Sequence, residues 1–144
     1  MAPQKYKILE DVAIADIAYE AYGKDIEELF ENAAFAIFEL SADIETFDAK
    51  KKLEFKLESS RMDNLLYDFL SEIIFLKDSK YMIFKKIKVS INKGKTCSLN
   101  AVMWGDKINP KKQGLKNDIK AITLHMFELK KEKNGYEATI VVDI

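Results

Sequence analysis

A strictly alternating run lies between two stretches with helical periodicity, and this order limits the folds open to the chain. Residues 51–58 read KKLEFKLE, so Leu53, Phe55 and Leu57 point to one side and charged side chains to the other. A period of two is typical of a strand with one face buried and one face in water. We therefore expect an antiparallel sheet that is covered on one side.

The two flanking stretches repeat their apolar residues at the spacing of an amphipathic helix. The first follows Asp25, a candidate N-cap, and has Glu27 and Glu28 in its first turn, where the helix dipole favours acids. The second covers about residues 62–77 and follows Ser60, also a candidate cap. The inward-facing residues are Ile26, Leu29, Phe30, Ala33, Ile37 and Leu40 in the first helix and Leu65, Leu66, Phe69, Leu70, Ile73 and Leu76 in the second.

The rest of the chain has mainly strand character. The strand-like runs are residues 6–10, 15–22, 83–92, 97–105, 119–130 and 136–143. The last four predict two hairpins, with turns at residues 92–95 and at 133–135, where Asn-Gly is the strongest short-range hairpin signal. With no linker of biased composition, we expect a single domain over residues 1–144. Its class is α+β, with antiparallel sheets and two amphipathic helices.

Charge is unevenly distributed, although the formal net charge is only −1. Residues 1–48 hold 3 Lys against 12 Asp plus Glu, a balance of −9, and residues 80–120 hold 11 Lys against 2 Asp, a balance of +9. Such a chain can orient on a charged partner, but ordinary solvated faces have the same composition. Direct RNA binding is expected to be weak, because no RNA-reading aromatic motif accompanies the lysines.

Most catalytic reagents are missing. The sequence has one His, one Cys, no Gly-x-x-x-x-Gly-Lys phosphate loop and no Gly-x-Ser-x-Gly elbow. A hydrolytic triad or a Cys-based zinc site is therefore excluded. The lone Cys97 lies in a strand-like run and is interpreted as an inert packed thiol in a reducing compartment. No segment approaches the ~18 apolar residues of a membrane span. We expect a cytoplasmic protein that is not itself an enzyme.

Two aspartates interrupt apolar strand-like runs, Asp16 in AIADIAY and Asp143 in TIVVDI. An unpaired carboxylate is costly to bury, so each lies either in water at a strand end or beside a cation. If the two strands end near one another, the pair makes a hard-oxygen site for Ca²⁺ or Mg²⁺. The carboxylate of Ile144 would add ligands if the chain ends there. Solvated acids at frayed strand ends are the alternative.

Three further residues are candidates for either a structural or a functional role. Lys120 lies among apolar neighbours in DIKAITLHMFEL, either as a charge that protects a sheet edge or as a cation facing an anionic ligand or the two acids. His125 is expected to be hydrogen-bonded and part-buried, not a ligand. Trp104 belongs either to the core or to a surface anchor.

Several segments, in order along almost the whole chain, resemble the archease family. They are ADIAYEAYGKDIEELFENAA at 15–34, DNLLYDFLSEIIFL at 63–76, MWGDKINPKKQGLKNDIKAITLH at 103–125 and VVDI at 141–144. The resemblance implies a fold of two interlocked strand–helix–strand–strand modules, in agreement with the element order above. It also implies a bound divalent cation, usually calcium, with ligands that match Asp16, Asp143 and Ile144. A lysine important in the family matches Lys120.

One segment departs from the family pattern. The family usually has Asp-His-Thr-Ala-Asp up to the first metal aspartate, whereas residues 11–16 here read DVAIAD. The histidine is absent and the segment is a residue longer, so any role of that histidine does not carry over.

The resemblance implies a metal-binding accessory protein of the GTP-dependent tRNA-splicing ligase. Such a protein promotes guanylylation of the ligase and its multiple turnover, and meets RNA indirectly through that partner. A chaperone-like modulator of another RNA enzyme, such as a tRNA methyltransferase, is the main alternative. A small carboxylate-based enzyme is the third and least favoured reading.

Overall fold

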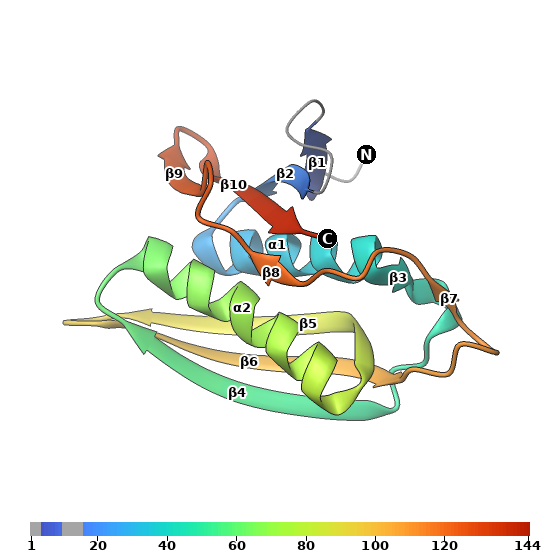
Figure 1. Cartoon of the computed structure of the whole chain (residues 1–144). Helices are drawn as coiled ribbons and strands as arrows, with labels where there is room; N and C mark the ends of the chain where they lie inside the picture. Colours follow the sequence, from blue (N-terminus) through green and yellow to red (C-terminus); the bar gives the residue numbers. More distant parts are fainter. Residues whose placement is uncertain (1–3, 10–15) are drawn as a thin grey trace.

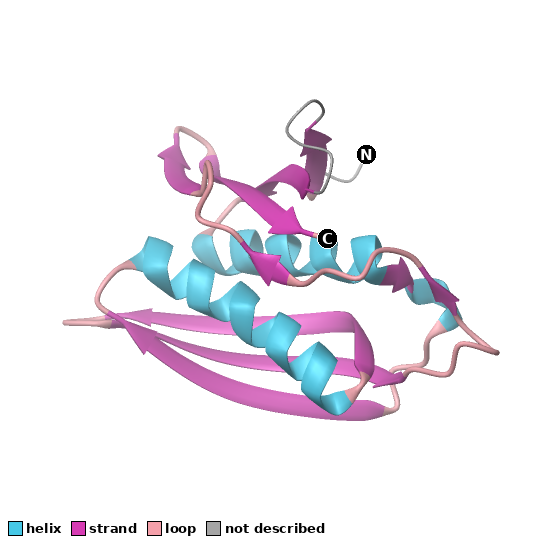
Figure 2. Ribbon diagram, viewed as in Figure 1, coloured by secondary structure: helices cyan, strands magenta, loops and turns pink. Residues whose placement is uncertain are grey.

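Two antiparallel sheets enclose a layer of two helices in the computed structural model, which describes residues 4–9 and 16–144 (Figures 1 and 2). The upper sheet of Figure 1 has the order β1 (Tyr6–Leu9), β2 (Asp16–Gly23), β10 (Gly135–Asp143) and β8 (Ala121–Ile122), and β9 (Glu128–Glu132) also pairs with β10. The lower sheet has the order β4 (Lys51–Ser59), β6 (Cys97–Lys107) and β5 (Met82–Lys93). Between them lie α1 (Ile26–Ser41) and α2 (Met62–Lys80). The predicted α+β class is confirmed.

A small element pair joins the two layers at one end. The two-residue strand β3 (Ala42–Asp43) leaves α1, pairs with β7 (Gly114–Leu115), and leads into the short 3-10 helix η1 (Ile44–Thr46). None of the helices or strands expected from the sequence covers β3, η1 or β7. Among the helices of the described residues, none is long and apolar enough to cross a membrane.

The first predicted helix and its cap are confirmed. Asp25 is the N-cap of α1, and its Oδ1 accepts a hydrogen bond from the Glu28 backbone N–H at 2.8 Å. The predicted stripe is buried except for Leu40, which is half-buried. The helix thus presents one apolar face toward β2 and another toward β5, because it packs between the two sheets.

Removing this cap is expected to weaken α1. Asp25→Ala leaves the Glu28 N–H without its side-chain acceptor and should lower the free energy of unfolding by about 1 kcal/mol. Asp25→Ser keeps an acceptor at the same position and should lose clearly less. Urea denaturation of the three proteins measures the difference. Equal losses for Ala and Ser would show that the cap does not stabilise the fold.

The second helix is confirmed, but its predicted cap is wrong. The N-cap of α2 is Arg61 and not Ser60, and it makes no side-chain capping hydrogen bond. The Arg61 guanidinium instead binds both carboxylate oxygens of Asp63, at 3.0 and 2.8 Å. The helix also continues to Lys80, three residues beyond the predicted end, and stops at Tyr81 in the left-handed conformation.

The alternating strand is confirmed as β4, with its apolar side against α2. Phe55 lies 6.0 Å from Phe69, centroid to centroid, and Phe69 lies 5.2 Å from Phe30 of α1. These three rings connect the lower sheet to both helices. Phe69 is fully buried and is therefore a central residue of the core.

Two glutamates of α1 satisfy the edge of β5. The Val89 N–H donates to Glu31 at 2.8 Å, and the Ile91 N–H donates to Glu27 at 2.9 Å. Both bonds satisfy strand amides that have no neighbouring strand on that side, since β5 is an edge of the lower sheet. Burial raises the pKa of Glu31, the Val89 N–H lowers it, and nearby acids raise it further.

This pKa direction predicts the effect of neutralising the residue. Glu31→Gln keeps an acceptor for Val89 and removes the half-buried charge, so it should be at least as stable as the wild type at neutral pH. Glu31→Ala leaves the Val89 N–H unpaired and should cost about 1 kcal/mol.

The pH dependence follows from the same shift. A raised folded-state pKa means that the folded protein binds the proton more tightly, so the Glu31 contribution to stability grows as pH falls through that pKa. The advantage of Glu31→Gln over the wild type should therefore shrink as pH falls through the raised folded-state pKa, and the shrinkage should be complete below the ordinary value of 4.5. Denaturation at several pH values measures it, and a pH-independent difference would contradict the assignment.

The prediction of one long strand over residues 119–130 is wrong. It divides into β8 and β9, which pair with different parts of the same neighbour, β10. Between them, Thr123 N–H still donates to Val141 O at 2.9 Å, but the chain then turns outward with Met126 in the left-handed conformation. The five residues 123–127 lie opposite only two residues of β10, Ile140 and Val141, and so they bulge out of the sheet. The two hairpin turns are confirmed, with Lys93 opposite Cys97 and Glu132 opposite Gly135.

Candidate functional site

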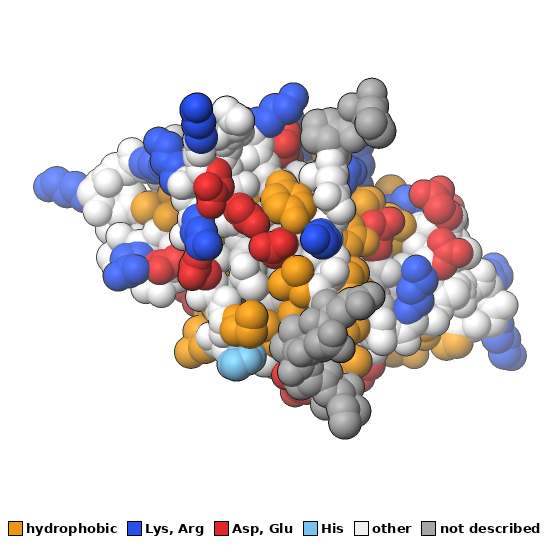
Figure 3. Space-filling model, turned by 90° about the horizontal axis from the view of Figure 1, so that it is seen from above, with side chains coloured by type: hydrophobic (Ala, Val, Ile, Leu, Met, Phe, Trp, Pro, Cys, Tyr) orange, Lys and Arg blue, Asp and Glu red, His pale blue; other side chains and the backbone are white. Residues whose placement is uncertain are grey.

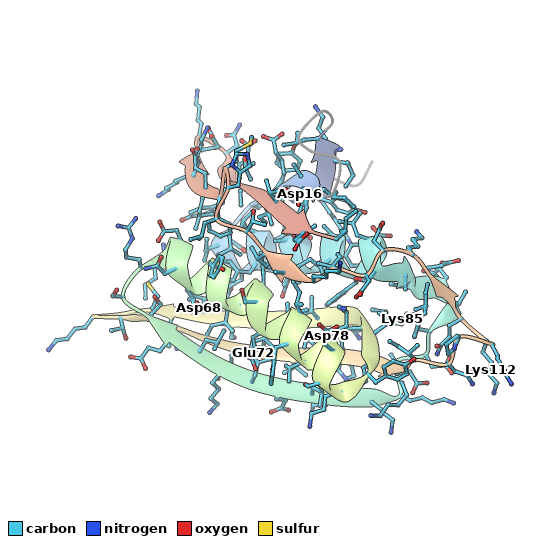
Figure 4. All side chains as sticks on the ribbon, in the orientation of Figure 1. Asp16, Asp68, Glu72, Asp78, Lys85 and Lys112 are labelled. Atoms are coloured by element: carbon cyan, nitrogen blue, oxygen red, sulfur yellow. The ribbon has the colours of Figure 1, made fainter. Side chains whose placement is uncertain are left out.

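Three strand ends meet at one corner of the upper sheet. Asp16 is the first residue of β2 and Asp143 is the last of β10, and the two are directly opposite in the antiparallel register. Ala121 of β8 lies on the other side of Asp143. Figure 4 shows the Asp16 side chain at this end of the sheet. We call the set Asp16, Lys120, Asp143 and Ile144 the C-terminal corner.

The two carboxylates lie on the same side of the sheet. Directly opposite residues of an antiparallel pair share a face and have Cα atoms about 4.5–5.5 Å apart. Ile17 and Val142, next to the two acids, point toward the helices, so the acids point away from them. Both acids are half-buried. In residues 4–9 and 16–144, no Lys or Arg ammonium or guanidinium pairs with either one.

Without a cation, the placement of Asp16 opposite Asp143 is electrostatically unfavourable. Like charges directly opposite on a sheet repel one another, and partial burial increases the cost. An aspartate in an apolar strand is expected at a strand end or beside a cation, and both acids lie at strand ends. The sequence did not reveal that these two ends face each other, because β2 and β10 are separated by almost the whole chain.

Lys120 joins the corner through its main chain. Its backbone N–H donates to the Asp143 carbonyl oxygen at 2.8 Å, which holds the residue beside the acid pair. The side chain is exposed and lines a hollow of about 290 Å³ between α2 and β8, together with Tyr67, Phe75 and Asp78. Lys120 therefore lies next to the acid pair and also borders this hollow.

The donor set fits a hard divalent cation in an open site. Carboxylate oxygens are the ligands preferred by Ca²⁺ and Mg²⁺. The described residues contain no group of three or more His, Cys, Asp or Glu that would hold a metal ion, and this corner brings together two. Among the described residues, the two acids and a main-chain oxygen of Ile144 fill only part of a coordination sphere of six or more, so the site has room for further oxygen ligands such as water.

The other residues considered in the sequence lie apart from the acid pair. His125 is exposed, so the prediction of a part-buried, hydrogen-bonded histidine is wrong; it lies on the outward bulge after β8. Trp104 is half-buried on the lower sheet, with the Lys86 ammonium 5.0 Å from its ring centroid. Cys97 is a free, half-buried thiol packed against the core.

The hollow beside Lys120 was not predicted from the sequence. Tyr67 of α2 donates its hydroxyl to the Ile122 carbonyl at 3.3 Å and fixes β8 against the helix. Phe75 is 60% exposed at the rim, and Leu124 and Met126 of the bulge are also exposed. In the predicted helix, Phe75 falls between the inward-facing positions Ile73 and Leu76 and is therefore on the solvent side. An aromatic residue on the solvent side of a helix is the one sequence signal that could have identified this hollow.

Comparison with known proteins gives one consistent result. The sequence matches the Archease protein family (MTH1598/TM1083) over residues 6–144. It is 36% identical over 141 residues to protein archease of Sulfurisphaera tokodaii, covering 98% of this chain and 99% of that one. It is also 36% identical over 143 residues to protein archease of Methanosarcina mazei, covering 98% and 97%.

Solved structures agree with the fold. The solution structure of Methanobacterium thermoautotrophicum protein 1598 superposes with a TM-score of 0.86 at 32% identity, covering 97% of this chain and 99% of that one. The crystal structure of a Thermotoga maritima archease, described as a possible chaperone, has a TM-score of 0.62 at 23% identity, covering 90% and 91%. At that identity the second structure supports the fold alone. The sequence and structural matches both extend over almost the entire chain, and the chain therefore belongs to the archease family.

Proposed function

We propose that this protein is a metal-binding accessory factor that activates the GTP-dependent tRNA-splicing ligase and does not join RNA itself. The observation that carries the proposal is the pairing of Asp16 with Asp143 at the end of two adjacent strands in a member of the archease family. These positions match the family's metal ligands, and the unbalanced acid pair gives a physical reason for a cation there.

Asp16, Asp143 and a main-chain oxygen of Ile144 would hold the cation, Ca²⁺ or Mg²⁺. A cation bound there neutralises the acid pair and offers open coordination positions to anionic oxygens of a partner or its nucleotide. The two acids would hold the cation at the strand ends, so that its open coordination positions face outward. Lys120, whose backbone N–H is hydrogen-bonded to the Asp143 carbonyl, would add a positive charge for the same partner to bind, next to the acid pair.

The surface around this corner supports a protein partner more than direct RNA binding. Seen from above, the upper face carries basic and acidic side chains intermixed over the sheet (Figure 3). A polyanion-binding surface would instead gather basic side chains of one sign. We therefore expect RNA to be reached through the ligase.

The test is a ligation assay with a cognate tRNA-splicing ligase, GTP and metal, in substrate excess. With this protein added, the number of ligations per ligase molecule should rise well above one, and the protein alone should join no RNA. Identical turnover with and without it would refute the proposal. Salt-sensitive, sub-micromolar tRNA binding by the isolated protein would favour a modulator of another RNA enzyme, such as a tRNA methyltransferase.

A further inference from the structure

The free edge of the lower sheet is long, regular and made of one strand, β4. Its nine residues pair continuously with β6 on one side, from Lys51 opposite Gly105 to Ser59 opposite Cys97. On the other side, no described strand pairs with it, and it runs along the border of the sheet (Figure 1). It contains no Pro, Gly or bulge. Such an edge is a ready template for pairing with another strand.

The other edge of the same sheet is treated differently. Glu27 and Glu31 accept the outward N–H groups of β5, so that edge is covered by α1. No comparable side-chain acceptor is found on β4 among the described residues. Charged side chains ordinarily protect an exposed edge from pairing, and β4 carries four of them on its solvent face, Lys52, Glu54, Lys56 and Glu58.

The order of these charges is self-complementary. Two copies of β4 can pair antiparallel about a two-fold axis through Phe55, and this register sets Lys52 opposite Glu58 and Glu54 opposite Lys56 of the second copy. Each combination occurs twice, so the register has four pairs of opposite charge on one face. On the other face it sets Leu53 against Leu57. Opposite charges facing each other across two strands attract, and like charges repel.

Neighbouring registers do not have this property. Side chains directly opposite must share a face, so the two strands can shift only by two residues at a time. A shift of two residues in either direction places Lys against Lys and Glu against Glu, at the centre of the pairing or next to it. The charges therefore specify one register of one strand pair.

We propose that two copies of this chain associate through β4, in the register centred on Phe55, to form one continuous six-stranded sheet. The nine-residue pairing supplies up to about ten backbone hydrogen bonds, because alternate opposed residues exchange two each. The four charged side chains are already exposed at the free edge. Lys52 and Glu54, whose side chains are 55% and 61% exposed, form an ion pair of 3.1 Å within one chain. On dimerisation each would pair with an opposite charge of the second copy instead. The C-terminal corner belongs to the upper sheet, on the opposite side of the helices, and stays accessible in the dimer.

The test is the oligomeric state of the full chain as a function of concentration, by light scattering coupled to size exclusion and by X-ray scattering, up to about 1 mM. The wild type should pass from monomer to dimer over this range, with a dimer scattering profile that matches a continuous sheet. Lys56→Glu puts Glu against Glu twice and should weaken the dimer about tenfold or more. The charge swap Glu54→Lys/Lys56→Glu restores opposite charges and should restore the dimer.

Lys88→Glu is the matched control. Lys88 is exposed on β5 of the same sheet, opposite Val102, and away from the free edge, so the same charge change there should leave the dimer intact. Circular dichroism verifies that each variant is folded. A wild type that stays monomeric up to ~1 mM would overturn the proposal. So would a dimer that is unaffected by Lys56→Glu, or one that the charge swap fails to restore.

Discussion

Replacing Asp16 or Asp143 with alanine should abolish the stimulation of the ligase while the protein stays folded. Each acid lies at a strand end, pointing away from the helices and the core, so neither supports packing. Within residues 4–9 and 16–144, each is also one of the two side-chain ligands that this corner offers to a cation. Loss of one removes about half of the charged donor set, and multi-turnover ligation should fall to the level seen without the protein.

Stability provides the control for these two variants. In metal-free buffer, removing one acid also removes repulsion from its neighbour, so the melting temperature should be unchanged or slightly higher. A loss of stimulation accompanied by a large fall in melting temperature would instead indicate a structural role for the acid. Full stimulation by either variant would contradict the proposed site.

Lys120 should behave differently from the two acids. Lys120 lines the neighbouring hollow, and a protonated ammonium is not a metal donor, so Lys120→Ala should impair ligase stimulation while metal affinity is largely retained. Lys116→Ala, an exposed lysine of the same loop, is the matched control and should have little effect. If both lysine variants lose stimulation equally, the loop acts through its overall charge and not through Lys120.

The largest loss of stability is expected for Phe69→Ala. Its ring is fully buried and lies between Phe30 of α1 and Phe55 of β4, so truncation opens a cavity where three elements meet. Such a change should cost roughly 3–5 kcal/mol of the free energy of unfolding. Phe75→Ala, on the same helix with a 60% exposed ring, should cost far less. Urea denaturation compares the two, and similar losses would contradict the described core.

The elements with strong local patterns were predictable from the sequence. The helical stripe after Asp25 and the alternation of residues 51–58 each specify an element and its buried face, because one period fits one geometry. The hairpin turns were also predictable, because their signals lie within three or four consecutive residues. These signals place both helices, the lower sheet and the ends of β9 and β10 without any knowledge of long-range contacts.

Elements decided by tertiary contacts were not predictable in the same way. Residues 119–130 contain no Gly or Pro to mark a break, and the division into β8 and β9 is made by their shared neighbour β10. Ser60 had the right residue type for a cap, but the Arg61 guanidinium engages Asp63 and the helix begins without a capping side chain. Both errors come from interactions that a local pattern does not contain.

The candidate site lies between these cases. The chemical anomaly of an aspartate in an apolar strand pointed to Asp16 and Asp143 separately, and the family resemblance joined them. That the two face each other depends on the pairing of β2 with β10, which only the structure gives. Residues 11–15, where the family histidine is missing, lie outside the described residues, as does the predicted start of the second strand at Ala15.

Calorimetric titration of Ca²⁺ and Mg²⁺ into four proteins tests the shared site most directly: the wild type, Asp16→Ala, Asp143→Ala and the double variant. Two ligands of one ion are strongly coupled, so each single variant should lose nearly all measurable affinity and the double variant should lose no more. Lys120→Ala should bind almost as tightly as the wild type. Equal affinity in all four proteins, or losses that simply add, would contradict a single cation held by Asp16 and Asp143 together.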